Sequence, residues 1–173
     1  MPGRPLAKYG QPGLRKRAVE IDEIDDSVRA LAGEMFERLS EVKGVGLAAP
    51  QMGVPLRLVV LSIPRDDGTR WKFALVNPVL VSRRGRTKSE EGCLSVPGVY
   101  EEIERAQEVE VRGLDLDGRD IVVQGDGLLA RALQHELDHL DGVLIVDRLS
   151  SVKRQALRRR LRKLEEEAQE SAH

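Results

Sequence analysis

Four strand-like runs in the middle of the chain constrain its fold more than any other feature. The first two runs are largely apolar and cover residues 56–63 and 72–80; the last two alternate and cover residues 108–115 and 119–125. Pro55, Pro64 and the Asp-Asp-Gly sequence at 66–68 break the chain around the first two runs. Residues 116–118, Leu-Asp-Gly, separate the last two runs, which are therefore expected to pair as a β-hairpin.

Helical patterns flank these strands on both sides. Apolar residues recur at helical spacing over residues 28–42, with possible N-caps at residues 25–27. A second helix is predicted from Leu128 to Leu140, and a third covers about residues 152–169. Neither a repeat nor a linker rich in Ser or Gly interrupts the chain, so residues 1–173 are predicted to form one α+β domain.

Composition excludes several classes of protein. Charged residues make up 33% of the chain but nearly cancel, to a formal net charge of −1, so overall charge gives no general attraction to nucleic acid or to a membrane. The apolar runs are too short to span a bilayer. Cys93 is the one cysteine, which excludes an internal disulfide, and no apolar secretion signal is visible. These features favour a reducing, cytoplasmic location.

The second predicted helix contains the sequence His-Glu-Leu-Asp-His, from His135 to His139. Residues i and i+4 share a helical face, so both imidazoles can reach one metal ion. Glu136 follows the first histidine directly and is placed to act as a general base. The alternative is two ordinary surface histidines on an amphipathic helix. The spacing favours a metal site.

Two histidines leave such an ion short of a third protein ligand. In many hydrolases with this pattern the third ligand is a downstream His or Glu, but the downstream acids of this chain do not follow those patterns. Cys93 is a candidate, because a thiolate binds borderline divalent metals well and a His₂Cys set with an open position suits hydrolysis. The residues alone leave open whether Cys93 is a ligand or a buried structural cysteine.

A glycine-rich stretch, residues 44–54, precedes the first strand-like run. It completes no phosphate-binding pattern and does not open a helix, so a nucleotide site is disfavoured. Two interpretations remain: a helix end followed by a turn, or a loop whose backbone approaches a ligand closely. In the second interpretation the amide of Gln51 points into a site.

Taken together, three stretches resemble the peptide deformylases of bacteria and organelles. Residues 44–51 match G-x-G-x-A-A-x-Q, residues 91–95 match E-G-C-x-S, and residues 135–139 match H-E-x-x-H, in the order of that family. The resemblance implies antiparallel sheets packed around a central HExxH helix, with an N-terminal and a C-terminal helix. It also implies a metal-dependent hydrolase that removes the N-formyl group from the formyl-methionine of newly synthesised polypeptides and releases formate.

Carried over by position, the resemblance makes Cys93, His135 and His139 the metal ligands. Glu136 would be the general base that later passes its proton to the leaving amine. The ion implied is ferrous iron (Fe²⁺), with nickel, cobalt or zinc as substitutes. A thiolate beside an oxidisable metal would make such an enzyme sensitive to oxygen.

The resemblance also implies how a peptide substrate would bind. The side chain of Gln51 and the backbone N–H of Leu94 would stabilise the oxyanion. The peptide would lie extended and pair with the backbone near Gly46, like an added strand. The pocket for the methionine side chain would be formed by Val45, Leu128, Ala132 and the aliphatic part of Arg131.

The third predicted helix, residues 152–170, is strongly basic at its start. Seven Lys and Arg side chains lie between Lys153 and Lys163 with no acid among them, and leucines form an apolar stripe. One interpretation is a docked helix with a solvated basic face. The other, which the resemblance supports, is contact with ribosomal RNA. The glutamates that follow would oppose phosphate, so such a contact should be weak and lost in salt.

Two other functions compete with deformylation. A metallopeptidase would take a downstream His or Glu as third ligand and would cleave unformylated peptides. An RNA- or ribosome-binding module would depend on the basic helix and not on the metal site. Deleting residues 152–173 distinguishes the binding module from a deformylase. A truncated deformylase that still folds would keep its hydrolytic activity.

Overall fold

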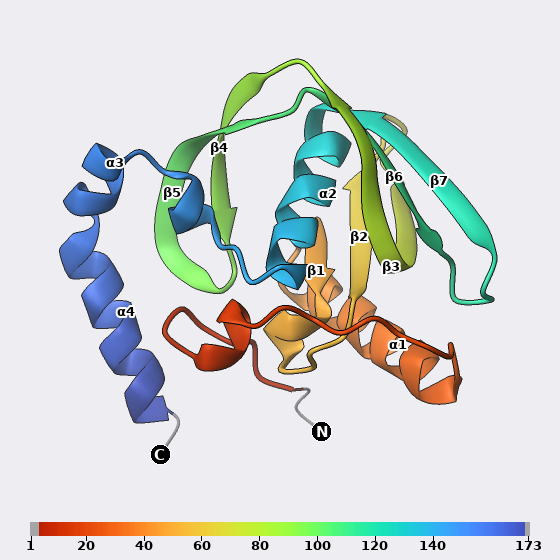
Figure 1. The fold of residues 1–173 in the computed structure, drawn as a ribbon, viewed down its shortest axis with the longest axis horizontal. Coiled ribbons are helices and arrows are strands. Elements are labelled where there is room, and N and C mark those ends of the chain that lie inside the picture. Colours follow the sequence, from red (N-terminus) through yellow and green to blue (C-terminus); the bar gives the residue numbers. More distant parts are fainter. Residues whose placement is uncertain (1–3, 172–173) are drawn as a thin grey trace.

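The structure, a computed structural model, describes residues 4–171 and contains two antiparallel sheets (Figure 1). The five-stranded sheet has the order β1-β2-β3-β6-β7. Its strands are β1 (Gly46–Ala48), β2 (Leu58–Pro64), β3 (Arg70–Arg84), β6 (Glu108–Leu114) and β7 (Asp120–Asp126). The second sheet is a two-stranded ribbon of β4 (Thr87–Cys93) and β5 (Val96–Arg105).

Four α-helices accompany these strands in the described part of the chain. They are α1 (Asp26–Glu41), α2 (Gly127–Leu140), α3 (Ser151–Ala156) and α4 (Arg158–Ser171). Short 3₁₀ turns cover Pro12–Arg15, Ala49–Met52 and Ile145–Arg148. The predicted α+β class with antiparallel sheets is therefore confirmed.

The four strand-like runs of the sequence correspond to β2, β3, β6 and β7. Strands β6 and β7 pair up to Leu114 and Asp120, which confirms the predicted hairpin. Strands β1, β4 and β5 were not predicted. Strand β4 reads Thr-Lys-Ser-Glu-Glu-Gly-Cys and has one buried residue, the charged Glu91, so it lacks the alternation of apolar and polar residues that marks a half-buried strand.

Strand β2 is buried on both faces, which explains its continuous apolar sequence. Successive side chains of a strand point to opposite faces. Leu58 and Val60 belong to the cluster that includes α1, whereas Val59 and Leu61 belong to the cluster that includes α2. The two helices thus cover opposite faces of this part of the sheet.

Helix α2 lies between the five-stranded sheet and the ribbon of β4 and β5 (Figure 1). On the sheet side, Ala130 and Leu133 pack with Val111 and Val123. On the ribbon side, Arg131 donates hydrogen bonds to backbone carbonyl groups of both ribbon strands. This position lets residues of the ribbon and of α2 meet at one site.

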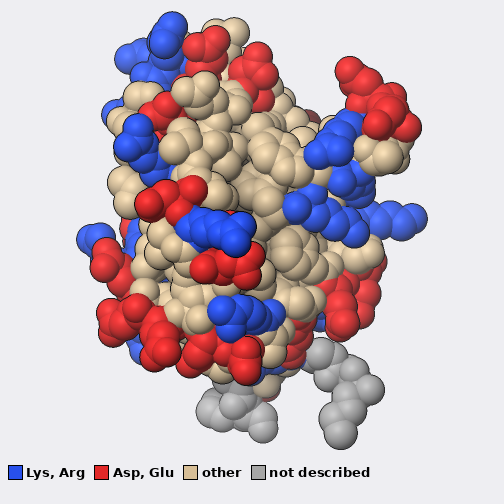
Figure 2. All heavy atoms as spheres, turned by 90° about the vertical axis from the view of Figure 1, so that its right-hand side faces the viewer, with Lys and Arg blue, Asp and Glu red and all other residues tan. Residues whose placement is uncertain are grey.

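The surface mixes charges of both signs. Figure 2 shows basic and acidic side chains interspersed, not segregated, on the face that it presents. Within residues 4–171, no helix has the length and apolar character that crossing a bilayer would need.

The predicted third helix differs from the observed structure. We expected one helix over residues 152–169, but α3 ends at Ala156 and α4 begins at Arg158. The apolar side chains Leu161, Leu164 and Ala168 of α4 are buried, and the two leucines pack in a cluster with Val96 and Val99 of β5. Helix α4 is thus docked on the ribbon through its apolar stripe.

We predict that Leu161→Ala lowers the free energy of unfolding by about 2–5 kcal/mol, because it removes a buried side chain from this contact. Arg162→Ala, at the exposed neighbouring position, is the control and should change it by less than about 0.5 kcal/mol. Urea unfolding followed by circular dichroism measures both. Equal effects of the two substitutions would contradict the docking of α4.

Candidate metal centre

Three potential metal ligands meet where the end of β4 approaches α2. One ligand atom each from Cys93, His135 and His139 lies within 4.8 Å of the others. The Sγ atom of Cys93 is 3.3 Å from Nε2 of His139, and the two imidazole ring centroids are 5.1 Å apart. The histidines come from one face of α2, as their i, i+4 spacing predicts.

The turn of the ribbon places Cys93 at this position. Strands β4 and β5 pair regularly up to Gly92 and Tyr100, and the register then shifts so that Cys93 pairs with Val96. Only Leu94 and Ser95 remain as a two-residue loop. A Cβ atom on Gly92 would lie 2.5 Å from the Tyr100 ring, so glycine lets this exposed ring lie directly against the backbone of β4.

The buried carboxylate of Glu91 joins the ribbon to the first histidine. Oε1 of Glu91 is 3.0 Å from Nδ1 of His135. Arg105 donates two hydrogen bonds of 3.0 Å to the same carboxylate, and Arg131 donates a third. Burial would raise the pKa of Glu91, but the hydrogen bonds from His135 and Arg105 outweigh it and lower the pKa to about 2. An ionised Glu91 accepts the Nδ1 proton of His135 and leaves Nε2 to face the site.

Arg131 has polar contacts that the sequence did not reveal. Besides Glu91, its guanidinium donates to the carbonyl oxygen of Ile103 at 3.0 Å and to that of Thr87 at 3.2 Å. Its charged end is therefore directed at the ribbon. Glu91 belongs to the E-G-C-x-S pattern, but that pattern alone suggested no hydrogen-bonding role for its carboxylate.

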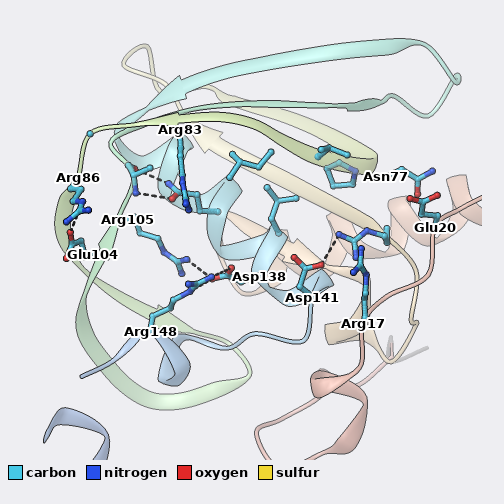
Figure 3. Close-up of a pocket in the computed structure, with 18 residues that line it drawn as sticks. Arg17, Glu20, Asn77, Arg83, Arg86, Glu104, Arg105, Asp138, Asp141 and Arg148 are labelled. Atoms are coloured by element: carbon cyan, nitrogen blue, oxygen red, sulfur yellow. Dashed lines mark hydrogen bonds and ion pairs between the residues drawn. The ribbon is translucent and has the colours of Figure 1, made fainter. Parts of the chain in front are cut away.

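The network continues beyond the site through Asp138 (Figure 3). Arg105 donates to one carboxylate oxygen of Asp138 at 2.6 Å, and Arg148 donates to the other at 2.7 Å.

A cavity of about 820 Å³ lies on this side of α2, and its lining includes Arg17, Arg83 and the three residues of the network, Arg105, Asp138 and Arg148. None of the three potential metal ligands lines it, so this cavity is distinct from the metal centre.

Glu136 is buried beside the histidines, with 4% of its surface exposed. Its Oε2 atom would lie only 2.6 Å from a Cβ atom on Gly46, so the missing side chain of that glycine leaves room for the carboxylate. Burial raises the pKa of Glu136 to about 7. A carboxyl group with such a pKa is suited to accept and return a proton near neutral pH.

These residues fit a divalent transition metal. A thiolate and two imidazoles form a donor set of the kind that borderline ions prefer, and three donors leave a coordination position open. Burial, together with the charges of His135 and Arg105, holds the pKa of His139 well below its usual range, which keeps this imidazole neutral. Among the described residues, Oε1 of Glu136 is buried without a hydrogen-bond partner. That oxygen is free to contact a reactant.

Gln51 and Leu94 lie next to this cluster. The amide of Gln51 is almost fully buried, its Oε1 accepts from the N–H of Ala48 at 3.0 Å, and its Nε2 donates to Oγ of Ser95 at 3.1 Å. The same Nε2 is 3.9 Å from Sγ of Cys93. Leu94 follows Cys93 directly in the two-residue loop. The structure therefore brings both residues to the edge of the metal centre.

The residues predicted to bind the methionine side chain come from α2 and from the segment that leads into β1. Ala132 is buried, and Val45 is partly buried against the same apolar cluster. Leu128, in the first turn of α2, is 46% exposed. Gly46 lies in β1, one of the two edge strands of the five-stranded sheet.

Comparisons with known proteins identify the family of this chain. The family model described as polypeptide deformylase matches residues 3–155. The peptide deformylase of Acidobacterium capsulatum is 45% identical, with 94% of this chain and 95% of that protein aligned. That of Thermomicrobium roseum is 44% identical over 98% of this chain and 95% of that protein.

Solved structures give the same result. A peptide deformylase from Legionella pneumophila superposes with a TM-score of 0.85 at 44% identity, covering 94% of this chain and 95% of that chain. The enzyme from Thermus thermophilus superposes with a TM-score of 0.86 at 41% identity, covering 95% of this chain and 98% of that chain. On the strength of the family model and these relatives, the chain belongs to the polypeptide deformylase family.

Proposed function

We propose that this protein is a metal-dependent hydrolase that removes the N-formyl group from the formyl-methionine of newly synthesised polypeptides. The observation that carries the proposal is the convergence of Cys93, His135 and His139 beside the buried carboxylate of Glu136. Membership of the polypeptide deformylase family supplies the reaction. The products are formate and a free terminal amine.

The proposed ligands are Sγ of Cys93 and one ring nitrogen each of His135 and His139. Ferrous iron is the proposed ion, and nickel, cobalt or zinc suit the same donor set. When bound, such an ion supplies a Lewis acid for the carbonyl oxygen and lowers the pKa of water. Cys93 and the two histidines would hold such an ion beside the buried Glu136.

Glu136 is the proposed general base. It takes a proton from the water whose oxygen attacks the formyl carbon, and it gives that proton to the amine nitrogen as the C–N bond breaks. The buried position of the carboxylate and its raised pKa support this role. The side chain of Gln51 and the N–H of Leu94 are the proposed donors to the oxyanion, and such donors are worth about 3–4 kcal/mol each in other enzymes.

Strand β1 is the proposed docking edge for the peptide. Its one partner in the described sheet is β2, so its other edge is available for an extended chain near Gly46. Val45, Leu128 and Ala132 are the proposed apolar contacts of the methionine side chain. Arg131 contributes only its methylene groups, because its guanidinium group donates hydrogen bonds to Glu91 and to two backbone carbonyl groups.

We further propose that residues 1–173 form a single catalytic domain with α2 as its central helix, and that the enzyme works in the cytoplasm. The basic residues of α3 and α4, within residues 152–170, are the proposed site of weak contact with ribosomal RNA. Arg158, Arg159 and Arg162 are exposed, whereas the leucine stripe of α4 is buried, which favours a role for the charges at the surface.

We predict that Glu136→Ala keeps the metal but lowers kcat for a formyl-Met peptide by about 10²–10⁴-fold, because it removes the base and none of the proposed ligands. Glu37→Ala, at an exposed position on α1, is the control and should keep the wild-type rate. Metal analysis and a formate-release assay measure both. A near-normal rate in Glu136→Ala would show that another group is the base.

The same assay separates deformylation from peptide-bond hydrolysis. The wild-type protein should release formate from formylated peptides and leave the peptide bonds of unformylated ones intact. Cleavage of internal peptide bonds would favour a metallopeptidase.

A triple substitution of Arg158, Arg159 and Arg162 by Glu is predicted to weaken binding to ribosomes by at least about tenfold at low salt, because three cations become anions. Deformylation of a short formyl-Met peptide should not change, since the substituted positions lie outside the metal centre. Cosedimentation at several salt concentrations measures the binding. If the triple variant binds ribosomes as tightly as the wild type, this face of α4 is not the site of ribosome contact.

A further inference from the structure

Residues 7–9, which precede the first 3₁₀ turn, contact backbone carbonyl groups next to the metal centre. The N–H of Ala7 donates to the carbonyl oxygen of Gln51 at 2.7 Å. The N–H of Tyr9 donates to the carbonyl oxygen of Ser95, also at 2.7 Å. Residues 7–9 thus bridge the two stretches that contain the proposed oxyanion donors, which come from separate elements of the fold.

Lys8 lies between these two backbone contacts. Its Nζ atom donates to the carbonyl oxygen of Leu94 at 2.9 Å, and the side chain is partly buried. Burial lowers the pKa of Lys8, and the nearby Cys93 sulfur acts in the opposite direction. Its hydrogen bond to Leu94 places the ammonium group beside the residue that directly follows the proposed ligand Cys93.

The loop between β4 and β5 consists of Leu94 and Ser95. Both of its carbonyl groups accept hydrogen bonds from residues 8 and 9. The same loop is tied to Gln51, because Oγ of Ser95 accepts a hydrogen bond from the Gln51 side-chain amide. Fixing these two successive peptide units restricts rotation of the backbone at Ser95. It also anchors the carbonyl end of Leu94, directly after the peptide unit that carries the Leu94 N–H. Donors to a developing charge must be held within about 0.5 Å of the productive position to be effective.

We propose that residues 7–9 form a strap that positions the oxyanion donors, and that Lys8 is its positioning residue. The inference rests on the proposed deformylation, because it assigns the strap to the donors of that reaction. The ammonium group also adds a fixed positive charge near the place where negative charge develops. A lysine that merely bonds to the nearest carbonyl group would affect stability without affecting turnover selectively.

The test compares four metal-loaded proteins: the wild type, Lys8→Met, Lys8→Arg and Lys16→Met. Lys8→Met keeps the length of the side chain without its charge, and Lys8→Arg keeps a charged donor. Lys16→Met removes an exposed lysine from the same part of the chain and serves as the control. Formate release from a formyl-Met peptide gives kcat and KM, and metal content and thermal melting report on the fold.

We expect Lys8→Met to lower kcat about tenfold with KM within about twofold of the wild type, which is the signature of an interaction made in the transition state. The kcat of Lys8→Arg should lie within about threefold of the wild-type value, and the kcat of Lys16→Met should equal the wild-type value. Hydrogen exchange of the Leu94 and Ser95 amides should be faster in Lys8→Met, since the loop loses one of its anchors.

A Lys8→Met protein with wild-type kcat would overturn the proposal. So would a loss of kcat that Lys8→Arg fails to recover, or one that accompanies loss of metal. If Lys8→Met does not melt cooperatively, Lys8→Gln replaces it, and wild-type kcat in Lys8→Gln overturns the proposal equally. A wild-type protein that releases no formate would instead refute the proposed function itself, so the two failures are distinguishable.

Discussion

The buried carboxylate of Glu91 holds together the two parts of the metal centre. Burying a carboxylate costs several kcal/mol unless it is paired and hydrogen-bonded, and here His135, Arg105 and Arg131 all contact it. Those contacts join the ribbon to α2. Because Cys93 lies two residues beyond Glu91 on the same strand, the interaction that orients His135 also places the thiol beside the histidines. The geometry of the site thus depends on one buried ionic cluster.

The sheet supplies the fixed support for this cluster. Helices α1 and α2 cover opposite faces of β2, so this part of the sheet is closely packed and α2 is held against it. At the edge of the sheet, β1 runs beside the site, and Gly46 leaves room for the carboxylate of Glu136. The proposed base, the proposed ligands and the proposed docking edge are therefore attached to rigid elements, while the oxyanion donors come from short loops that the N-terminal segment contacts.

The sequence predicted the parts of this arrangement that have a local signature. The spacing of His135 and His139 placed both on one helical face, and the alternating runs predicted the hairpin of β6 and β7. Strands β4 and β5 were not predicted, because their pairing depends on a register that composition does not reveal. The contacts of Arg131 were also missed, since a buried arginine in an apolar helix is recognisable only when its partner on the ribbon is known. The break at Leu157 left no signature in the leucine spacing.

The most direct test of the account is a metal analysis and formate assay on protein purified without oxygen. The account predicts about one transition-metal ion per chain, and release of formate from a formyl-Met peptide in proportion to the metal bound. Substituting Cys93 by Ala should remove both the ion and the activity, because two histidines alone bind a divalent ion weakly. Protein that carries no stoichiometric transition metal, or that releases formate equally well without one, would contradict the central claim.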